Sequence, residues 1–274
     1  TIVVADSTLY AGETTPVTIT FSEPVTGFTN ADLAVANGQL TSVTSSDGGI
    51  TWTATFTPTT GVKDATNIIT LANNLIFDLA GNAGSGTTNS GNYSIDTVVP
   101  TATVVVANPT VSIGGSSLVT ITFNEAVSGF TNADLNVPNG TLSQVISSDG
   151  GVTWTATLTP TSNVSVTDNA IRLHYTDIRL ASSGNVGTGD TFSNHYTVDT
   201  QRPTATVVVN NDTLGIGGSS LVTITFSEAV TGLTTADLTA DSGTLSNLVT
   251  SDNITYTATL TAAPGITQGN NQVL

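Results

Sequence analysis

The sequence predicts an all-β protein built from tandem β-sandwich domains, and three observations carry that prediction. Threonine alternates with aliphatic or aromatic residues at a period of two, as in half-buried strands. No segment sustains a helical period. The chain is also self-similar: Phe21, Phe123 and Phe226 stand in the same Thr-Ile-Thr-Phe context at intervals of 102 (123 − 21) and 103 (226 − 123) residues, which indicates a repeated domain.

The boundaries of the repeats follow from one recurrent joint. The run Asp96-Thr97-Val98-Val99-Pro100 returns as Asp199-Thr200-Gln201-Arg202-Pro203. We expect each Asp to end a strand, each proline to stiffen the crossing, and the Thr/Val alternation that follows to open the next strand. This places the repeats at residues 1–98, 99–201 and 202–274, the third incomplete and without its last strand. We also expect the sequence to be an excerpt from a longer array.

Strand patterning within one repeat predicts the type of sandwich. In the second repeat we expect strands at residues 101–107, 117–123, 134–137, 142–147, 152–159, 170–175 and 193–198. Seven short strands in about 100 residues are typical of an immunoglobulin-like sandwich. Alternation gives the positions that should face inward, which are Val119, Ile121 and Phe123 in the second strand and Val152, Trp154, Ala156 and Leu158 in the fifth.

Glycine-rich turns connect these strands. Asp47-Gly48-Gly49 and Asp149-Gly150-Gly151 lie between the fourth and fifth strands, where glycine supplies the positive φ of a tight hairpin. The third repeat has Ser251-Asp252-Asn253 instead. Residues 81–91 and 182–194, rich in Gly, Ser and Asn, are interpreted as long, flexible surface loops.

Charge and composition exclude several classes of partner. The formal charge of −16 includes only four basic residues, so a nucleic-acid backbone would be repelled. Lys63 is expected in a loop. The chain has no cysteine, which excludes disulfides and Cys-ligated metals, and no apolar run long enough to insert into a membrane.

Two longer motifs point to a family. They are Thr-Ile-Thr-Phe-Ser-Glu-x-Val-(Thr/Ser)-Gly-Phe-Thr-Asn-Ala-Asp-Leu and Ser-Ser-Asp-Gly-Gly-(Ile/Val)-Thr-Trp-Thr-Ala-Thr, followed by Gly-Asn and by Asp-Thr-x-x-Pro. Together they resemble the Ig-like repeats of giant secreted bacterial adhesins, and the resemblance covers essentially the whole chain. It implies an extracellular or cell-surface stalk of many domains, stiffened by calcium at its joints, exported by a type I system and ending in an adhesive tip.

Carboxylates are expected to gather where one repeat meets the next. If successive strands alternate in direction, the turns after the second, fourth and sixth strands reach the end of the domain that receives the preceding linker. Three acidic sets fall there: Asp96, Glu125, Asp134 and Asp149 at the first joint; Asp199, Glu228, Asp237 and Asp252 at the second; Glu23, Asp32, Asp47 and Asp78 at the free end of the first repeat.

Converging carboxylates without a nearby lysine or arginine repel one another unless a cation neutralises them. Oxygen ligands on flexible loops suit Ca²⁺, so we predict structural Ca²⁺ at the joints, with the twelve acidic residues as its ligands. The alternative is that these residues only form turns and keep the chain soluble. Asp78 has no acidic counterpart at a spacing of 103, where Ala181 stands.

Other site chemistries are weaker. His174 and His195 do not recur between repeats, which argues against zinc. Trp52 and Trp154 lie within alternating strands and are interpreted as core residues rather than sugar-stacking platforms. No nucleophile and base recur at a fixed spacing, and no phosphate loop is present, so we do not expect an enzyme.

Three functions remain open. The first is a spacer in a calcium-rigidified adhesin stalk, whose partners are its neighbouring repeats. The second is binding of a glycan or a surface receptor protein through loops, for which Ile178, Arg179, Phe192 and His195 distinguish the second repeat. The third is self-assembly with other copies into an extracellular filament or surface layer, with strand exchange at the third repeat.

Overall fold

The computed structural model describes all residues from Thr1 to Leu274 and divides into two compact units, Thr1–Thr200 and Gln201–Leu274. Strands form nearly all of its regular structure, which confirms the all-β prediction. Its helical segments are four 3₁₀ turns of three residues each, none of which could cross a lipid bilayer.

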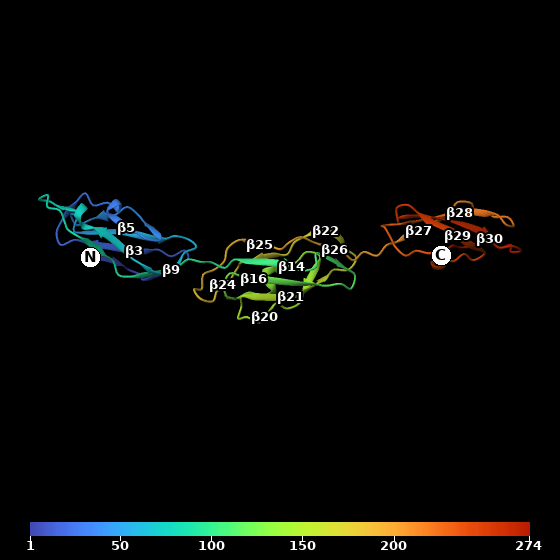
Figure 1. Cartoon of the computed structure of the whole chain (residues 1–274), viewed down its shortest axis with the longest axis horizontal. Helices are drawn as coiled ribbons and strands as arrows, with labels where there is room; N and C mark the ends of the chain where they lie inside the picture. The colour runs from blue at the N-terminus through green and yellow to red at the C-terminus, as the bar shows by residue number, and fades with distance from the viewer. The chain divides into compact units, whose positions relative to one another are not determined.

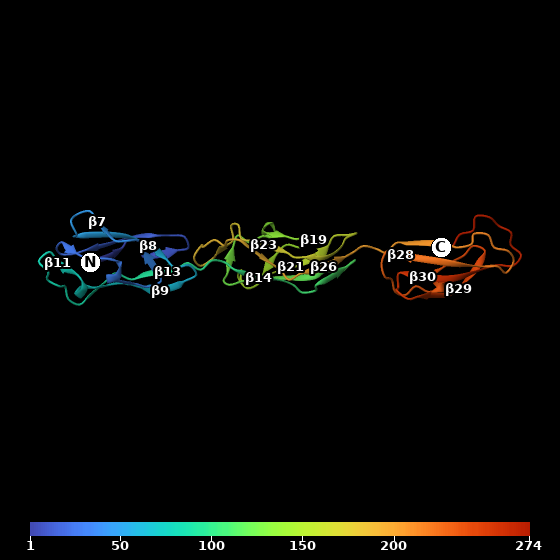
Figure 2. The ribbon, with the colours of Figure 1, turned by 90° about the horizontal axis from the view of Figure 1, so that it is seen from above.

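The first repeat, drawn in blue to cyan in Figures 1 and 2, is a two-layered sandwich. One layer is a sheet of β1 (Ile2–Val4), β3 (Thr15–Thr20), β8 (Thr51–Pro58) and β6 (Gly38–Leu40), with β7 (Thr44–Ser45) also paired to β8. The opposite side consists of β2 (Thr8–Tyr10), β13 (Tyr93–Asp96) and β9 (Lys63–Asn67), then β12 (Thr87–Asn89), β10 (Ile69–Ala72) and β5 (Leu33–Val35), and a pair of β11 (Phe77–Asp78) and β4 (Val25–Thr26). The 3₁₀ turns are η1 (Asn30–Asp32) and η2 (Asn73–Leu75).

The second repeat reproduces this arrangement. Its first layer contains β14 (Ala102–Val106), β16 (Ser117–Phe123), β21 (Thr153–Pro160), β19 (Gly140–Leu142) and β20 (Ile146–Ser147). The opposite side contains β15 (Thr110–Ser112), β26 (Tyr196–Asp199) and β22 (Ser165–Asn169), then β18 (Leu135–Asn136), β23 (Arg172–His174) and β25 (Asp190–Phe192), and the pair β17 (Val127–Ser128) and β24 (Arg179–Leu180), with η3 (Asn132–Asp134).

The core lies between the layers, as alternation requires. Val119, Ile121 and Phe123 are buried, which confirms the inward face of the second predicted strand. In the fifth strand Ala156 and Leu158 are buried, whereas Val152 and Trp154 are half-buried.

The tryptophan interpretation is confirmed. The Trp154 ring packs edge-on against Phe130 at 5.2 Å, and its Nε1–H donates to the carbonyl oxygen of Gly151 at 3.0 Å. Trp52 makes the equivalent contacts with Phe28 and Gly49. Both indole rings therefore close the core beside the glycine turn.

The sequence missed several short strands. In the second repeat, β15 and β22 lie outside every predicted strand, β25 falls inside the predicted 182–194 loop, and the predicted 142–147 strand divides between β19 and β20. In the first repeat, β12 lies inside the 81–91 loop. These strands are short and mostly exposed, so no apolar alternation marks them. Lys63 begins β9 and is not in a loop.

The second unit is a single four-stranded sheet with a small core. Its strands are, in sheet order, β27 (Ala205–Val209), β28 (Ser219–Phe226), β30 (Thr255–Ala262) and β29 (Gly243–Thr250), and η4 (Thr235–Asp237) lies between β28 and β29 along the chain. The strands β28, β30 and β29 lie side by side in Figure 2. Its buried core is Val222, Ile224 and Tyr256.

Candidate functional site: the first joint and an end pocket

A lysine occupies the first joint. The Lys63 Nζ lies 3.3 Å from Oδ2 of Asp96 and 3.0 Å from Oε2 of Glu125, so one ammonium bridges the last strand of the first repeat and the turn after β16 in the second. The Glu125 and Asp96 carboxylates raise the pKa of Lys63, and the ammonium lowers that of Glu125. The expectation that no basic side chain would accompany these carboxylates was wrong. Half of the lysine is exposed, so the stabilisation is modest.

Asn185 makes the most complete contact across this joint. Its side-chain amide donates to the carbonyl oxygens of Asp96 and Val98, both at 2.7 Å. Its Oδ1 accepts from the backbone N–H of Ala11 at 3.0 Å. The residue is 5% exposed, so the second repeat binds three backbone groups of the first from a nearly water-free position.

The linker itself is anchored on both sides of the joint. Thr97 is buried, and its hydroxyl donates to the carbonyl oxygen of Thr59 at 2.6 Å, which fixes the linker to the first repeat. Val98 packs against the core of the second repeat. Adjacent residues of the linker are therefore held by different repeats, Thr97 by the first and Val98 by the second.

The structure does not gather the predicted ligands into metal-sized clusters. No group of three or more His, Cys, Asp or Glu side chains could hold a metal ion. Asp32, Asp134 and Asp237 cap their own 3₁₀ turns by accepting from the N–H groups of Thr29, Thr131 and Thr234 at 2.8, 2.8 and 2.9 Å. The acidic turn residues thus have local partners, and calcium binding by them stays a prediction.

The hairpin aspartates are occupied in the same way. Asp149 accepts from the backbone N–H of Thr153 at 2.8 Å and of Val152 at 3.2 Å, and from the Ser147 hydroxyl at 2.9 Å. These bonds, led by that from Thr153, lower the pKa of Asp149 from 3.8 to about 2. Asp47 has the matching contacts and a pKa of about 2, and Asp252 accepts from Ile254 and Thr255.

This geometry predicts an acid-sensitive hairpin. The folded-state pKa of Asp149 is below its ordinary value, so its contribution to stability is complete above about pH 4 and is lost as the pH falls towards 2. We expect Asp149→Ala to unfold at a lower temperature than the native chain at neutral pH, and the gap to close between about pH 4 and 2. Calorimetry of both chains across this range measures the gap, and a gap independent of pH contradicts the assignment.

Two carboxylate oxygens at strand ends are buried without a hydrogen-bond partner, Oδ1 of Asp96 and Oδ1 of Asp199. At Asp96 the other oxygen has Lys63, which pairs with it across β9 and β13. Opposite Asp199 the register position that Lys63 holds opposite Asp96 is occupied by Ser165, so this strand pair provides no ammonium for the Asp199 carboxylate. Glu228 lies in the second unit, after β28.

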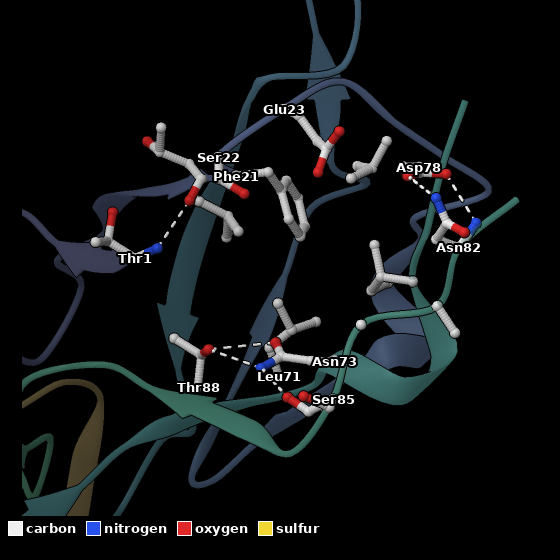
Figure 3. A pocket seen from close by; sticks show the side chains of 16 residues that line it. Thr1, Phe21, Ser22, Glu23, Leu71, Asn73, Asp78, Asn82, Ser85 and Thr88 are labelled. Carbon is white, nitrogen blue, oxygen red and sulfur yellow. Dashed lines mark hydrogen bonds between the residues drawn. The ribbon is translucent and has the colours of Figure 1, made fainter. Parts of the chain in front are cut away.

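A cavity of about 410 Å³ opens at the end of the first repeat. Figure 3 shows Phe21, Glu23, Asp78 and Asn82 among the residues around it. Asp78 accepts from the backbone and side-chain nitrogens of Asn82 at 2.8 and 2.7 Å. Of the four acidic residues predicted at this end, Glu23 and Asp78 therefore line one cavity, whereas Asp32 and Asp47 do not.

Strand register corrects one alignment. Asp78 pairs with Val25 as Leu180 pairs with Val127, so the structural counterpart of Asp78 is Leu180 and not Ala181. The loop that follows is one residue longer in the second repeat, where Asn185 takes the place of Asn82: Leu180 donates to the Asn185 carbonyl as Asp78 does to that of Asn82.

Sequence reasoning missed Asn185 because an asparagine in a Gly-Ser-Asn loop carries no chemical signal of its own. The Gly-Asn pair shared by the two repeats was the available clue. Among the residues thought to distinguish the second repeat, Ile178 is buried in the core, whereas Arg179 and Phe192 are exposed. His195 pairs with Asp168, and His174 with Asp190.

The chain is similar to FdeC, an adhesin of Escherichia coli, at 17% identity and a TM-score of 0.35, covering 96% of this chain and 88% of that one. It is also similar to InvD of Yersinia pseudotuberculosis, at 18% identity and a TM-score of 0.30 with coverage of 100% and 83%. The chain is similar to InvE of the same species at 16% identity and a TM-score of 0.30, covering 93% of this chain and 72% of that one. At these values the likenesses carry no functional argument.

No curated protein matches the sequence. A model of the bacterial Ig-like domain matches three consecutive segments, residues 1–95, 96–198 and 199–274, and so accounts for the whole chain. The chain therefore belongs to the bacterial Ig-like domain family, as three tandem copies of the domain.

Proposed function

We propose that this chain is a spacer from the stalk of a secreted bacterial surface adhesin, in which each repeat holds its neighbour in a defined orientation. The observation that carries the proposal is the buried Asn185 amide, which binds three backbone groups of the preceding repeat. A flexible linker between independent domains would leave such groups to water. Backbone recognition also tolerates changes in side chains, which suits an array of similar repeats.

Charge and the Asp-Thr-Val linker support the same role. A net charge of −16 keeps a long array soluble and discourages lateral association. The linker is fixed to the first repeat through Thr97 and to the second through Val98, so few residues remain free to bend. Residues of the two repeats themselves make the contacts at this joint, through the side chains of Lys63 and Asn185.

Distances between two spin labels test the spacer role. The chain has no cysteine, so Thr57→Cys and Thr159→Cys introduce unique labelling sites on exposed strand positions of β8 and β21. Double electron–electron resonance on the doubly labelled 274-residue chain should give a single narrow distance distribution. A broad distribution, as in a flexible tether, overturns the proposal. A matched pair within one repeat, Thr57→Cys with Thr18→Cys, sets the width expected of a rigid body.

Calcium at the joints is proposed for one position in particular. Asp96 and Asp199 each have a buried Oδ1 without a hydrogen-bond partner, but Asp199 fits a cation better because Ser165 pairs with it where Lys63 pairs with Asp96. The carboxylate oxygen is a ligand that Ca²⁺ prefers. The metal would supply the positive charge that Lys63 supplies in the first joint.

We therefore expect calcium binding that depends on Asp199. Isothermal titration of the 274-residue chain with CaCl₂ should show a dissociation constant of about 10⁻⁴–10⁻³ M, as in other extracellular modules. Asp199→Asn should abolish the heat, whereas Asp96→Asn should leave it in place. Equal binding by all three chains would place the metal elsewhere, and no heat from the native chain would remove calcium from the proposal while leaving the Asn185 joint intact.

A further inference from the structure

One outward sheet face of the second repeat differs from its counterpart in the first. We name it the aromatic face and define it as the exposed side chains of β18, β23 and β25, which are Asn136, Arg172, His174, Asp190 and Phe192. Strand register places Arg172 between Asn136 and Phe192, and His174 opposite Asp190. Three neighbouring strands therefore present five side chains to the solvent on one side of the sheet.

Comparison of the two repeats shows that these strands differ on their outward side. The inward residues that pair across them are the same in both repeats: Leu33 and Leu135, Leu71 and Leu173, Thr88 and Thr191. In the first repeat the five outward positions hold uncharged residues without an aromatic ring: Ala34, Thr70, Ala72, Thr87 and Asn89. Core packing therefore does not account for the charged and aromatic side chains of the second repeat.

Phe192 is the apolar part of the aromatic face. It is 61% exposed and is the only large apolar side chain among the five. In the first repeat the matching Asn89 accepts a hydrogen bond from the Thr70 hydroxyl at 2.9 Å, which satisfies that cross-strand pair. Phe192 offers no such acceptor to Arg172, which stands opposite it. A phenylalanine ring left in water contributes little burial to the fold, so it is available to a ligand.

The polar groups beside the ring place a donor next to an acceptor. Nη2 of Arg172 lies 3.0 Å from Oδ2 of Asp190, and Nδ1 of His174 lies 2.5 Å from Oδ1. Hydrogen bonds from His174 and Arg172 lower the pKa of Asp190, which keeps it a carboxylate at neutral pH. Arginine has five N–H donors, so its contact with Asp190 leaves others for a ligand.

Size and charge decide which class of ligand fits. A stable protein–protein interface covers about 800 Å² on each partner around an apolar centre, which one phenylalanine among polar side chains does not provide. The net charge of −16 repels polyanions, and the ion pair of Arg172 with Asp190 leaves no unpaired charge to attract a small ion. The fitting ligand is a small uncharged molecule with one apolar side and a rim of groups that both donate and accept. A pyranose sugar has this form, because C–H groups cover one side of its ring and hydroxyls surround it.

From these observations we propose that the aromatic face of the second repeat binds a neutral pyranose sugar. The C–H side of the sugar lies on the Phe192 ring, whose face carries partial negative charge and attracts C–H hydrogens. Two adjacent hydroxyls reach the Arg172–Asp190 pair, where one accepts from the guanidinium and the other donates to the carboxylate. The inference goes beyond the spacer function, because the joint contacts of Lys63 and Asn185 involve none of the five residues.

NMR titration of the 15N-labelled 274-residue chain tests the proposal. The probes are methyl β-galactopyranoside, methyl β-glucopyranoside, methyl α-mannopyranoside and N-acetylglucosamine. At least one should shift the backbone amides of β23 and β25 together with one arginine Nε–H resonance. The dissociation constant should be on the order of 1 mM, as for a ligand of about 13–15 non-hydrogen atoms. The proposal is overturned if none of the four sugars shifts these signals at about 50 mM, well above that constant.

Substitutions taken from the first repeat show whether the aromatic face holds the sugar. Phe192→Asn and Arg172→Thr introduce the residues of the matching first-repeat strands, so both variants keep a sheet surface that already folds. Each should weaken binding about tenfold or more. Phe192→Trp should strengthen it, because the indole ring offers a larger stacking surface.

Phe77→Asn is the matched control for loss of an exposed ring. Phe77 is 45% exposed in the first repeat, which contains no arginine, so this variant should bind the sugar as the native chain does. Native affinity in Phe192→Asn, or loss of binding in Phe77→Asn, would show that the sugar is held elsewhere and would reject the aromatic face as its site. Neither outcome affects the spacer function, which the spin-label distances test separately.

Discussion

Gly151→Ala is expected to lower the free energy of unfolding of the second repeat by about 3 kcal/mol. Gly151 has a φ of +102°, and a Cβ placed there would lie 2.8 Å from the carbonyl oxygen of Val127. That oxygen belongs to the main chain, so it can move only if the strand moves with it. The amide of Val127 donates to the carbonyl of Gly151 at 3.0 Å, which ties the two segments together and prevents local relief.

The adjacent residue provides the matched control. Gly150 also has a positive φ, +78°, but a Cβ there would meet no atom within 4 Å. Gly150→Ala should therefore lower the free energy of unfolding only by the cost of a positive φ at an L-residue, about 1 kcal/mol. Urea unfolding of the two single variants measures the difference. If both cost the same, the contact with Val127 is not the reason for glycine at this turn. Gly49, whose Cβ would lie 2.6 Å from the Val25 carbonyl, should repeat the effect in the first repeat.

The fold could be predicted from the sequence wherever burial of one strand face imposes an alternation of apolar and polar residues. Val119, Ile121 and Phe123 lie in β16, which has the predicted bounds, because each inward residue must be apolar and each outward one need not be. The edge strands could not be predicted, because most of their residues are exposed and no alternation is imposed on them. In β22, Ser165–Asn169, only the last residue is buried, so nothing in its composition separates it from a loop.

The contacts of the first joint could be predicted only in part. The carboxylates at Asp96 and Glu125 could be expected to meet, because a charged residue at a strand end and another in a turn reach the same end of the domain. Lys63 lies opposite Asp96 because β9 pairs with β13, and no alternation of apolar residues in the sequence reveals β9. Asn185 depends in addition on the path of a long loop, which its Gly, Ser and Asn residues leave undetermined.

The Asn185 amide should have the largest effect on the joint. Asn185→Ala removes two donors and one acceptor, and it leaves the carbonyl oxygens of Asp96 and Val98 without these partners in a place that water barely reaches. At about 1 kcal/mol for each hydrogen bond lost, together with desolvated groups left unpaired, the joint should weaken by about 2–4 kcal/mol. The spin-label distribution between Thr57 and Thr159 should broaden, while each repeat should keep its own strands.

Asn185→Asp distinguishes hydrogen bonding from shape. The carboxylate has the size of the amide and can still accept from Ala11, but it cannot donate to the two carbonyl oxygens, and its charge is buried. We therefore expect it to broaden the distribution at least as much as Asn185→Ala does. Asn82→Ala, the equivalent substitution in the first repeat, should leave this distribution unchanged. If Asn185→Asp kept the native width, the loop would act by filling space. The two repeats would then be held by Lys63, by Val98 and by the hydrogen bond from the Asn124 amide to the Val99 carbonyl.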